Sequence, residues 1–444
     1  MTLDELRGEV ADGRIDTVLV CLTDMQGRLQ GKRMHAEHFL DEVVSHGAEA
    51  CNYLLAVDVD MTTVDGYAMS SWETGYGDFV MAPDLATLAP VPWQEGTAMV
   101  LCDLRWEDGR DVAPSPRQVL RGQLDRLAER GWIANAGTEL EFIIFEDAYE
   151  AAWDKGYRDL TPANRYNVDY SMLGTARVEP LLRRIRNAMH GAGMRVEDSK
   201  GECNFGQHEV NFHYADALTS ADRHVVYKNG AKEIAAEMGC SITFMAKYDE
   251  REGNSCHIHL SVAEAEGGDN VFAKDEAVFE AFLAGQLATL RELTLFLAPN
   301  INSYKRYAAA SFAPTTVAWG HDNRTCAFRV VGHGPGRRIE CRVGGGDLNP
   351  YLALSALIAG GLHGVEQGLE LEPALEGNAY VAQQRPHVPT TLRHARDLFG
   401  ESDVARTAFG QEVVDHYLNM ARLEVEAYDA VVTDWERVRG FERL

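Results

Sequence analysis

Two glutamates that stand two positions apart in a predicted strand constrain the fold more than any other feature of the chain. The stretch 137–145 is rich in residues that favour β-structure, so it is predicted to form a buried strand. Because side chains alternate between the faces of a strand, Glu139 and Glu141 are expected to point the same way. Two buried carboxylates on one face repel each other and lose hydration unless a cation compensates them. A divalent metal is the simplest compensation, and a strand end with both acids in solvent is the alternative.

Length, charge and cysteine usage limit the class of the protein. With 444 residues the chain exceeds one ordinary domain, and a cluster of Asp, Gly and Pro predicts two domains, at 1–108 and 109–444. The formal net charge of −26 argues against a nucleic-acid or anionic-membrane partner, because the field of the protein repels phosphate. Eight scattered cysteines, an acidic start without a signal-peptide core, and apolar runs too short for a bilayer predict a cytoplasmic protein.

Helical and strand-like segments follow one another without a regular repeat. Strand-like segments include 17–23, 28–33, 98–104, 209–213, 241–246, 257–262, 328–331 and 339–343. Helical segments include 116–130, 178–192, 219–239, 277–298, 351–367 and 412–438. The absence of a regular βαβ repeat predicts an α+β fold rather than a doubly wound parallel sheet.

Two further pairs of residues could join these glutamates at a metal site. Glu202 and Glu209 flank a glycine turn that can bring them together. His257 and His259 share one face of a predicted strand behind a polar loop that contains Gly253, and a structural role for each histidine is the alternative. The His-Glu-x-x-x-His run that starts at position 208 lacks the i, i+4 spacing of zinc proteases, which excludes that class.

A dense basic set lies in the C-terminal part of this acidic chain. Its members are Lys305, Arg306, Arg324, Arg329, Arg337 and Arg338. The strand-like segment 339–343 places Glu340 and Arg342 on one face. Arginine binds carboxylate and phosphate through parallel hydrogen bonds, so the set predicts an anion site, with a solvated basic face as the alternative. Oxygen-rich ligation suits Mg²⁺ or Mn²⁺, and these ions with phosphate-binding arginines indicate phosphoryl transfer from a nucleotide.

Taken in order, six short motifs make nearly the whole chain resemble the glutamine synthetase family. They are Gly137-Thr-Glu-Leu-Glu-Phe142, Gly206-Gln-His-Glu-Val210, His257-Ile-His259, Asn302-Ser-Tyr-Lys-Arg306, Asn323-Arg-Thr325 and Arg338-Ile-Glu-Cys-Arg342. The resemblance implies an N-terminal β-grasp domain and a C-terminal catalytic domain with a mainly antiparallel curved sheet. It also implies ATP, two or three Mg²⁺ or Mn²⁺ ions per site, and a homododecamer whose active sites lie between neighbouring subunits.

The same resemblance implies a role for each candidate residue. One metal would be held by Glu141, Glu202 and Glu209, and the other by Glu139, His257 and Glu340. The nucleotide would face His259, Ser261, Arg329 and Arg338, with Arg324 acting near its phosphates. The glutamate substrate would contact Gly253, Arg306 and Arg342. Asp65 would reach a neighbouring subunit and deprotonate the amine.

Two positions depart from the family pattern. A few residues after their Lys-Arg pair, glutamine synthetases have a glutamate that helps to bind ammonium, and Phe312 stands in its place. An aromatic ring has no carboxylate to pair with ammonium, but it packs well on a carbon chain. Glu252 stands where the family usually has an asparagine near the glutamate substrate. In Phe312, in the run from Asp249 to His257 and in Val330-Val-Gly-His-Gly334 the chain resembles the actinobacterial γ-glutamylamide ligases. Asp24-Met-Gln-Gly-Arg28 and Asp434-Trp-Glu-Arg-Val-Arg-Gly-Phe441 resemble the ethanolamine-using branch of these ligases.

The sequence therefore predicts an ATP-dependent glutamate–amine ligase. Such an enzyme joins the γ-carboxylate of glutamate to a small primary amine through a γ-glutamyl phosphate. Ethanolamine is the first predicted amine and a polyamine the second. Ordinary glutamine synthetase and a catalytically silent structural or binding protein are the remaining alternatives. The reason for this order is that all six predicted metal ligands are present while the ammonium-binding glutamate is not.

Overall fold

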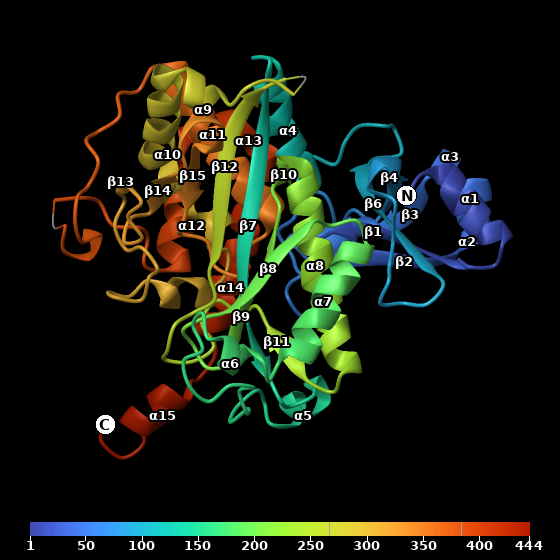
Figure 1. The fold of residues 1–444 in the computed structure, drawn as a ribbon, viewed down its shortest axis with the longest axis horizontal. Helices are drawn as coiled ribbons and strands as arrows, with labels where there is room; N and C mark the ends of the chain where they lie inside the picture. Colours follow the sequence, from blue (N-terminus) through green and yellow to red (C-terminus); the bar gives the residue numbers. More distant parts are fainter. Residues whose placement is uncertain (266, 383) are drawn as a thin grey trace.

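A computed structural model of the chain describes residues 1–265, 267–382 and 384–444, and it contains two β-sheets (Figure 1). The N-terminal sheet has the order β2-β1-β6-β4-β3, with β5 paired to β6. Its strands are β1 (Thr17–Thr23), β2 (Leu29–His35), β3 (Ala48–Cys51), β4 (Asp78–Pro83), β5 (Ala89–Pro90) and β6 (Thr97–Arg105). Only β1 and β6 pair in parallel in this sheet. Short helices α1 (Leu3–Ala11), α2 (Ala36–His38) and α3 (Val44–His46) accompany it.

The turn between β1 and β2 explains why the first hairpin forms where the sequence predicts it. Gly27 adopts a φ of +76°, a conformation that glycine reaches without steric cost. The buried Asp24 carboxylate accepts the backbone N–H groups of Gln26 and Arg28 at 3.0 and 2.9 Å. These hydrogen bonds satisfy backbone N–H groups of the turn and fix its conformation. The two strands that it connects pair antiparallel.

The larger sheet has nine strands in the order β13-β14-β15-β12-β7-β9-β8, with β10 and β11 paired to β7. Its strands are β7 (Trp132–Phe145), β8 (Val196–Gly201), β9 (Gln207–Phe212), β10 (Ala215–Asp216), β11 (Ser241–Thr243), β12 (Cys256–Glu264), β13 (Trp319–His321), β14 (Phe328–Val331) and β15 (Arg338–Cys341). Every pairing is antiparallel except that of β13 with β14. The predicted α+β class and the mainly antiparallel sheet are therefore confirmed.

Helices surround this sheet, and two of them pack unusually closely. They are α4 (Pro116–Ala128), α5 (Tyr149–Asp154), α6 (Met172–Thr175), α7 (Glu179–Gly191), α8 (Ala217–Glu237), α9 (Val271–Lys274), α10 (Glu276–Leu297), α11 (Pro350–Gln367), α12 (Leu392–Glu401), α13 (Asp403–Phe409), α14 (Gln411–Asp429) and α15 (Asp434–Gly440). A Cβ atom on Gly285 of α10 would lie 2.2 Å from the carbonyl oxygen of Gly360 of α11. Glycine at this contact lets the two backbones approach each other.

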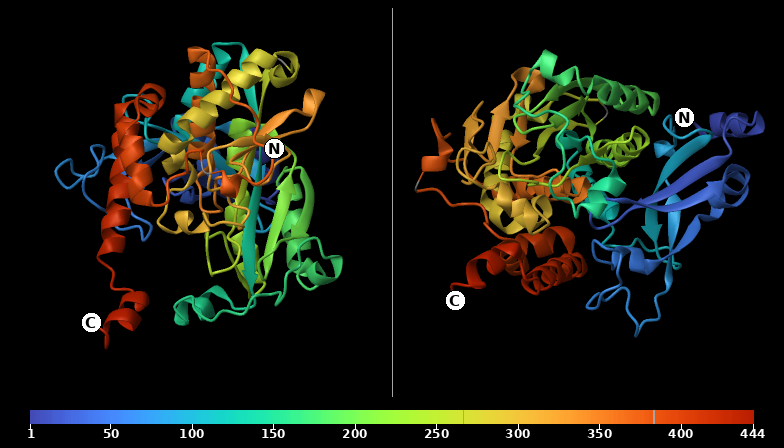
Figure 2. Two further views of the ribbon diagram at one scale, coloured as in Figure 1. Left: turned by 90° about the vertical axis from the view of Figure 1, so that its left-hand side faces the viewer. Right: turned by 90° about the horizontal axis from the view of Figure 1, so that it is seen from below.

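Buried contacts connect the N-terminal sheet to the rest of the chain, although the sheet lies to one side of the molecule (Figure 2). Each of the two large hydrophobic clusters contains residues from both sides of position 108. The buried Arg117 of α4 binds Asp84 and Asp103 of the N-terminal part and Asp222 of α8, at 2.7, 2.5 and 2.9 Å. The domain boundary near residue 108 and the β-grasp character of the first domain stay predictions.

Three local predictions need correction. The central strand β7 begins at Trp132, five residues before the stretch that the sequence predicts. A serine directly before the predicted helix 116–130 is expected to cap it, but the side chain of Ser115, at the cap position of α4, forms no capping hydrogen bond. The predicted C-terminal helix ends at Asp429, and α15 follows as a separate helix.

Within the described ranges, no helix combines the length and the hydropathy that a membrane crossing requires.

Candidate active site

The register of the larger sheet lines up five of the six predicted metal ligands, together with His259, across four neighbouring strands. Glu209 of β9 lies directly opposite Glu141 of β7. Glu139 of β7 lies opposite His257 of β12, and His259 of β12 lies opposite Glu340 of β15. Opposed residues of paired strands point to the same face, and so do residues two apart on one strand. All six side chains therefore share one face of the sheet. In Figure 1 the two longest strands of this row, β7 and β12, run side by side through the centre of the fold.

At one end of the row the glutamates already have cationic or hydrogen-bonding partners. Glu139 Oε2 lies 3.1 Å from His257 Nδ1, and its Oε1 lies 2.9 Å from His259 Nε2. The buried Glu340 accepts hydrogen bonds from Arg329 at 2.8 Å and Arg342 at 2.5 Å. Burial alone raises the pKa of Glu139 and of Glu340, but the nearby histidines, with Arg342 for Glu340, lower both pKa values below the ordinary one. Both carboxylates are consequently ionised at neutral pH.

At the other end of the row three carboxylates meet with too little positive charge. Oxygen atoms of Glu141, Glu202 and Glu209 lie within 4.8 Å of one another. Burial, together with the charge of Glu141, raises the pKa of Glu202 to about 8. Burial and the neighbouring glutamates raise the pKa of Glu209 well above its usual value. Lys200 forms an ion pair with Glu202, but one ammonium group cannot neutralise three carboxylates, so the cluster fits a divalent cation.

Both histidines of β12 are placed to join a metal cluster with Glu139 and Glu340. Ligand atoms of Glu139, His259 and Glu340 lie within 4.8 Å of one another. His257 Nδ1 lies 3.7 Å from Glu340 Oε1, and its buried Nε2 has no hydrogen-bond partner in the described part of the chain. A buried ring nitrogen without a partner is available to a metal. The assignment of the metal to His257 rather than to His259 stays a prediction.

Two adjoining pockets contain most of the predicted site residues. The first, here called the carboxylate pocket, has a volume of about 1000 Å³. The predicted residues that line it are Glu139, Glu141, Glu202, Glu209, Gly253, His257, Phe312, Arg324, Arg329 and Arg342. The second, here called the His259 pocket, has a volume of about 920 Å³, and its predicted residues are Glu139, His259, Ser261 and Arg338. Glu139 lines both pockets, so ligands bound in them would meet at this residue.

Three predicted residues line neither pocket in the single chain. One of them is Glu340, whose side chain is fully buried against Arg329 and Arg342. Asp65 is exposed, and its backbone oxygen accepts a hydrogen bond from Asn419 at 3.1 Å. Arg306 is buried, and its guanidinium group donates to the Val343 carbonyl at 2.9 Å and to Ser255 Oγ at 2.8 Å. Neither residue lines the carboxylate pocket or the His259 pocket. Their roles with the amine and with glutamate stay predictions.

Sequence reasoning missed the residues that support the glutamates. Glu141 Oε2 accepts the backbone N–H of Ser255 at 2.6 Å and the side-chain amide of Gln207 at 3.1 Å. Lys200 pairs with Glu202. The signal for Lys200 was present, because Lys200 and Glu202 are two positions apart and extended chain places such side chains on one face. Gln207 gave no such signal, since its contact depends on how two distant segments pack.

The loop that carries Phe312 has a strained backbone. Phe312 has a φ of +58° and Ala310 a φ of +62°, both in the left-handed region. A bulky aromatic residue rarely adopts this conformation, and such residues cluster at functional sites. The Phe312 side chain is 54% exposed and lines the carboxylate pocket beside Ser311. The pocket thus combines a charged interior with an aromatic group on its wall.

Comparison with known proteins places this site in a family. Residues 113–439 match the family of the glutamine synthetase catalytic domain. Because this match covers well over half of the chain, the protein belongs to the glutamine synthetase family.

Among individual relatives, the γ-glutamylethanolamide synthetase GlnA4 of Streptomyces coelicolor is 64% identical over 100% of this chain and 96% of its own length. The glutamate–isopropylamine ligase of a Pseudomonas species is 37% identical over 98% of this chain and 97% of its own. A solved GmaS/ADP complex superposes with a TM-score of 0.86 at 27% identity, covering 98% of this chain and 99% of that one. The family resemblance inferred from six motifs is thereby confirmed.

Proposed function

We propose that this protein is an ATP-dependent ligase that joins the γ-carboxylate of glutamate to ethanolamine through a γ-glutamyl phosphate. One observation carries the proposal: a single pocket combines the three-glutamate cluster and arginine side chains with Phe312 on its wall. The carboxylates and arginines suit phosphoryl transfer, and the aromatic side chain suits an amine with a carbon chain. The 64% identity to a γ-glutamylethanolamide synthetase over the whole chain supports the same amine.

The donor groups in the pockets fit divalent metal ions. In this proposal Glu141, Glu202 and Glu209 hold one ion, Glu139, His257 and Glu340 hold another, and each site binds two or three ions. The crowded carboxylates and the unpartnered Nε2 of His257 support this assignment. When bound, Mg²⁺ or Mn²⁺ would supply positive charge for the transferred phosphoryl group. The family membership implies ATP and divalent metal use in general.

The remaining side chains bind and orient the two organic substrates in this proposal. His259, Ser261, Arg329 and Arg338 face ATP, and Arg324 stabilises charge on its phosphates. Gly253, Arg306 and Arg342 hold glutamate, and Phe312 packs on the carbon chain of the amine. The role of Arg342 is supported by its position, because it lines the carboxylate pocket and its guanidinium group donates a hydrogen bond to Glu340.

We further propose that the active form is a cytoplasmic homo-oligomer, a dodecamer by family analogy, in which a second copy completes each site. The exposed position of Asp65, outside both pockets of its own chain, supports a role across a subunit interface. Asp65 of a neighbouring copy would take a proton from the amine before it attacks the acyl phosphate.

A panel of amines tests the proposed substrate. We expect phosphate release with glutamate, ATP and Mg²⁺ to have its highest kcat/KM with ethanolamine, and a much lower value with ammonium. Putrescine and spermine as the best amines would shift the assignment to polyamines. Ammonium as the best amine would make the protein an ordinary glutamine synthetase, and no turnover with any amine would indicate a silent family member.

Replacing Phe312 by glutamate tests why ammonium is excluded. The new carboxylate at the pocket wall is expected to raise kcat/KM for ammonium about tenfold, because it can pair with the cation, and to lower the value for ethanolamine. The measurement is phosphate release with both amines. Trp153→Glu, which adds the same charge at an exposed aromatic residue of α5, is the matched control and should change neither value. Unchanged ammonium use in Phe312→Glu would show that this side chain does not contact the amine.

A further inference from the structure

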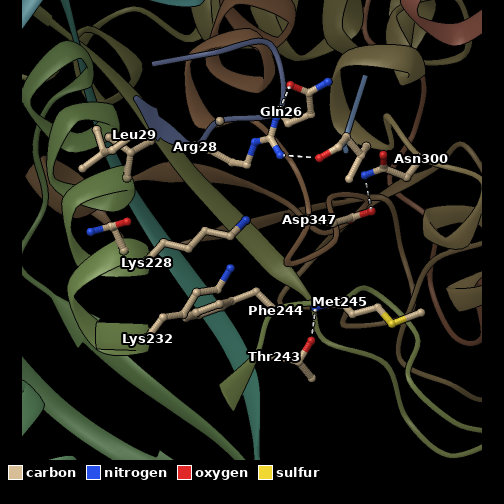
Figure 3. A pocket seen from close by; sticks show the side chains of 14 residues that line it. Gln26, Arg28, Leu29, Lys228, Lys232, Thr243, Phe244, Met245, Asn300 and Asp347 are labelled. Atoms are coloured by element: carbon tan, nitrogen blue, oxygen red, sulfur yellow. Dashed lines mark hydrogen bonds between the residues drawn. The ribbon is translucent and has the colours of Figure 1, made fainter. Parts of the chain in front are cut away.

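A third pocket lies between the first hairpin and the body of the protein, with a volume of about 230 Å³ (Figure 3). It shares no lining residue with the carboxylate pocket or the His259 pocket. The turn that contains Arg28 and Leu29 forms one wall, and helix α8 forms another. The segment from Thr243 to Met245, together with Asp347, completes the lining. None of the functional assignments above uses this pocket.

Two lysines make the pocket cationic inside a strongly acidic chain. Lys228 and Lys232 extend from α8 into the pocket (Figure 3), and their ammonium groups lie 5.6 and 5.8 Å from the centroid of the Phe244 ring. Lys228 donates to the Gly346 carbonyl at 2.7 Å. In the described ranges neither lysine has a carboxylate within 4.0 Å. Burial and the charge of Lys232 lower the pKa of Lys228 to about 8, so the two cations are poorly compensated.

The other charged groups of the pocket are already engaged. Arg28 donates to Asp24 at 2.7 Å and to the Val59 carbonyl at 2.6 Å. The Asp347 carboxylate accepts from Asn300 at 2.9 Å and Ser303 at 2.6 Å through its Oδ2 atom. Asp347 Oδ1 remains without a hydrogen-bond partner in the described part of the chain. Since Arg28 is paired with Asp24, Asp347 is the one carboxylate among the lining residues that could offset Lys228 and Lys232.

We propose that this pocket binds a small organic anion, with its carboxylate or phosphate group held by Lys228 and Lys232. Lysine ammonium groups bind both kinds of oxyanion as point charges. The apolar side chains of Leu29, Val225 and Phe244 provide a surface for a short hydrocarbon body. A volume of about 230 Å³ lies below the range of drug-sized ligand sites, which limits the ligand to a small metabolite-sized anion. The proposal does not depend on the identity of the amine substrate.

A chain of hydrogen bonds gives the pocket a structural link to the metal cluster. Lys228 holds the Gly346 carbonyl, and the Gly346 N–H donates to the Asn254 carbonyl at 2.9 Å. The Asn254 side chain accepts from Gln207 at 3.0 Å, and Gln207 donates to Glu141 at 3.1 Å. An anion that draws the Lys228 ammonium group away from Gly346 would therefore loosen the support of the loop beside Glu141.

Titration of the intact protein with inorganic phosphate and, separately, with succinate tests the proposal, and the two probes distinguish a phosphate from a carboxylate ligand. Isothermal titration calorimetry of the wild type should show saturable binding of at least one probe with a Kd below about 10 mM. Lys232→Gln should weaken this binding on the order of tenfold, because it removes one of two facing charges. Lys232 is exposed, so the variant should fold normally, which circular dichroism checks.

Lys155→Gln is the matched control, because it removes the same charge from an exposed surface lysine of the chain outside all three pockets. Its affinity for both probes should equal that of the wild type. If the wild type, Lys232→Gln and Lys155→Gln all bind the probes with the same affinity, the measured binding belongs to the arginine-lined pockets. That result would overturn the proposal. Failure of both probes to bind the wild type would overturn it as well.

Discussion

Replacing Glu209 by glutamine is expected to lower kcat/KM by roughly three orders of magnitude while raising the melting temperature of the metal-free protein. Glu209 is buried beside two other glutamates, and burial and their charges raise its pKa well above the usual value. The neutral amide keeps the size of the side chain but removes this repulsion, so the folded state gains stability. The same change removes a charged ligand of the proposed metal site. Phosphate release and thermal unfolding in a chelator measure the two effects.

The opposite signs separate a functional role of Glu209 from a structural one. A residue needed only for folding would lose activity and stability together. Glu150→Gln, an exposed change in the first turn of α5, is the control and should alter neither quantity. Normal kcat/KM in Glu209→Gln would remove this residue from the metal site.

The same cluster makes the stability of the metal-free protein depend on pH. Glu202 has an ordinary pKa of 4.5 and a folded-state pKa of about 8, so the folded state keeps a proton that the unfolded chain releases. Its contribution to stability is therefore complete below pH 4.5 and is lost as the pH rises through about 8. If Glu202 is a metal ligand as proposed, a bound Mn²⁺ would replace this proton, and Mn²⁺ should raise the melting temperature more at pH 8 than at pH 6. An equal shift at both values would contradict the assignment.

Asp65→Asn is expected to lower kcat with ethanolamine by about a hundredfold or more, because asparagine cannot accept the proton of the amine. The KM for ATP should stay close to that of the wild type, since Asp65 is proposed to act on the amine and not on the nucleotide. Full kcat in this variant would exclude Asp65 as the base. Asparagine is chosen because it keeps the size of the aspartate side chain and removes its charge.

Coexpression of Asp65→Asn chains with Glu209→Gln chains tests whether the base acts across subunits. In a mixed oligomer with shared sites, about a quarter of the sites combine an intact Asp65 from one chain with intact metal ligands from its neighbour. The mixed oligomers should therefore regain roughly a quarter of the wild-type activity. No recovery in coexpressed oligomers of normal size would contradict the shared site.

Local patterns predicted most elements, and errors occurred at their ends. The hairpin around Gly27 and the helices α8, α10 and α11 fall close to their predicted positions, because the turn residues and the apolar period specify them locally. The C-terminal helix was predicted without the break between α14 and α15. The capping box that Thr433 forms with Glu436 at the start of α15 is a local signal of this break, and the prediction did not use it.

The site shows the same division between local and tertiary information. The alternation of side chains along a strand can be read from the sequence alone. It predicted that Glu139 shares a face with Glu141, and His257 with His259. Only the tertiary structure joined these pairs into one row, because the register of β15, β12, β7 and β9 depends on packing between segments far apart in the chain. The strained φ of Phe312 and the facing of Lys228 and Lys232 toward the first hairpin likewise follow from that packing, which no spacing in the sequence encodes.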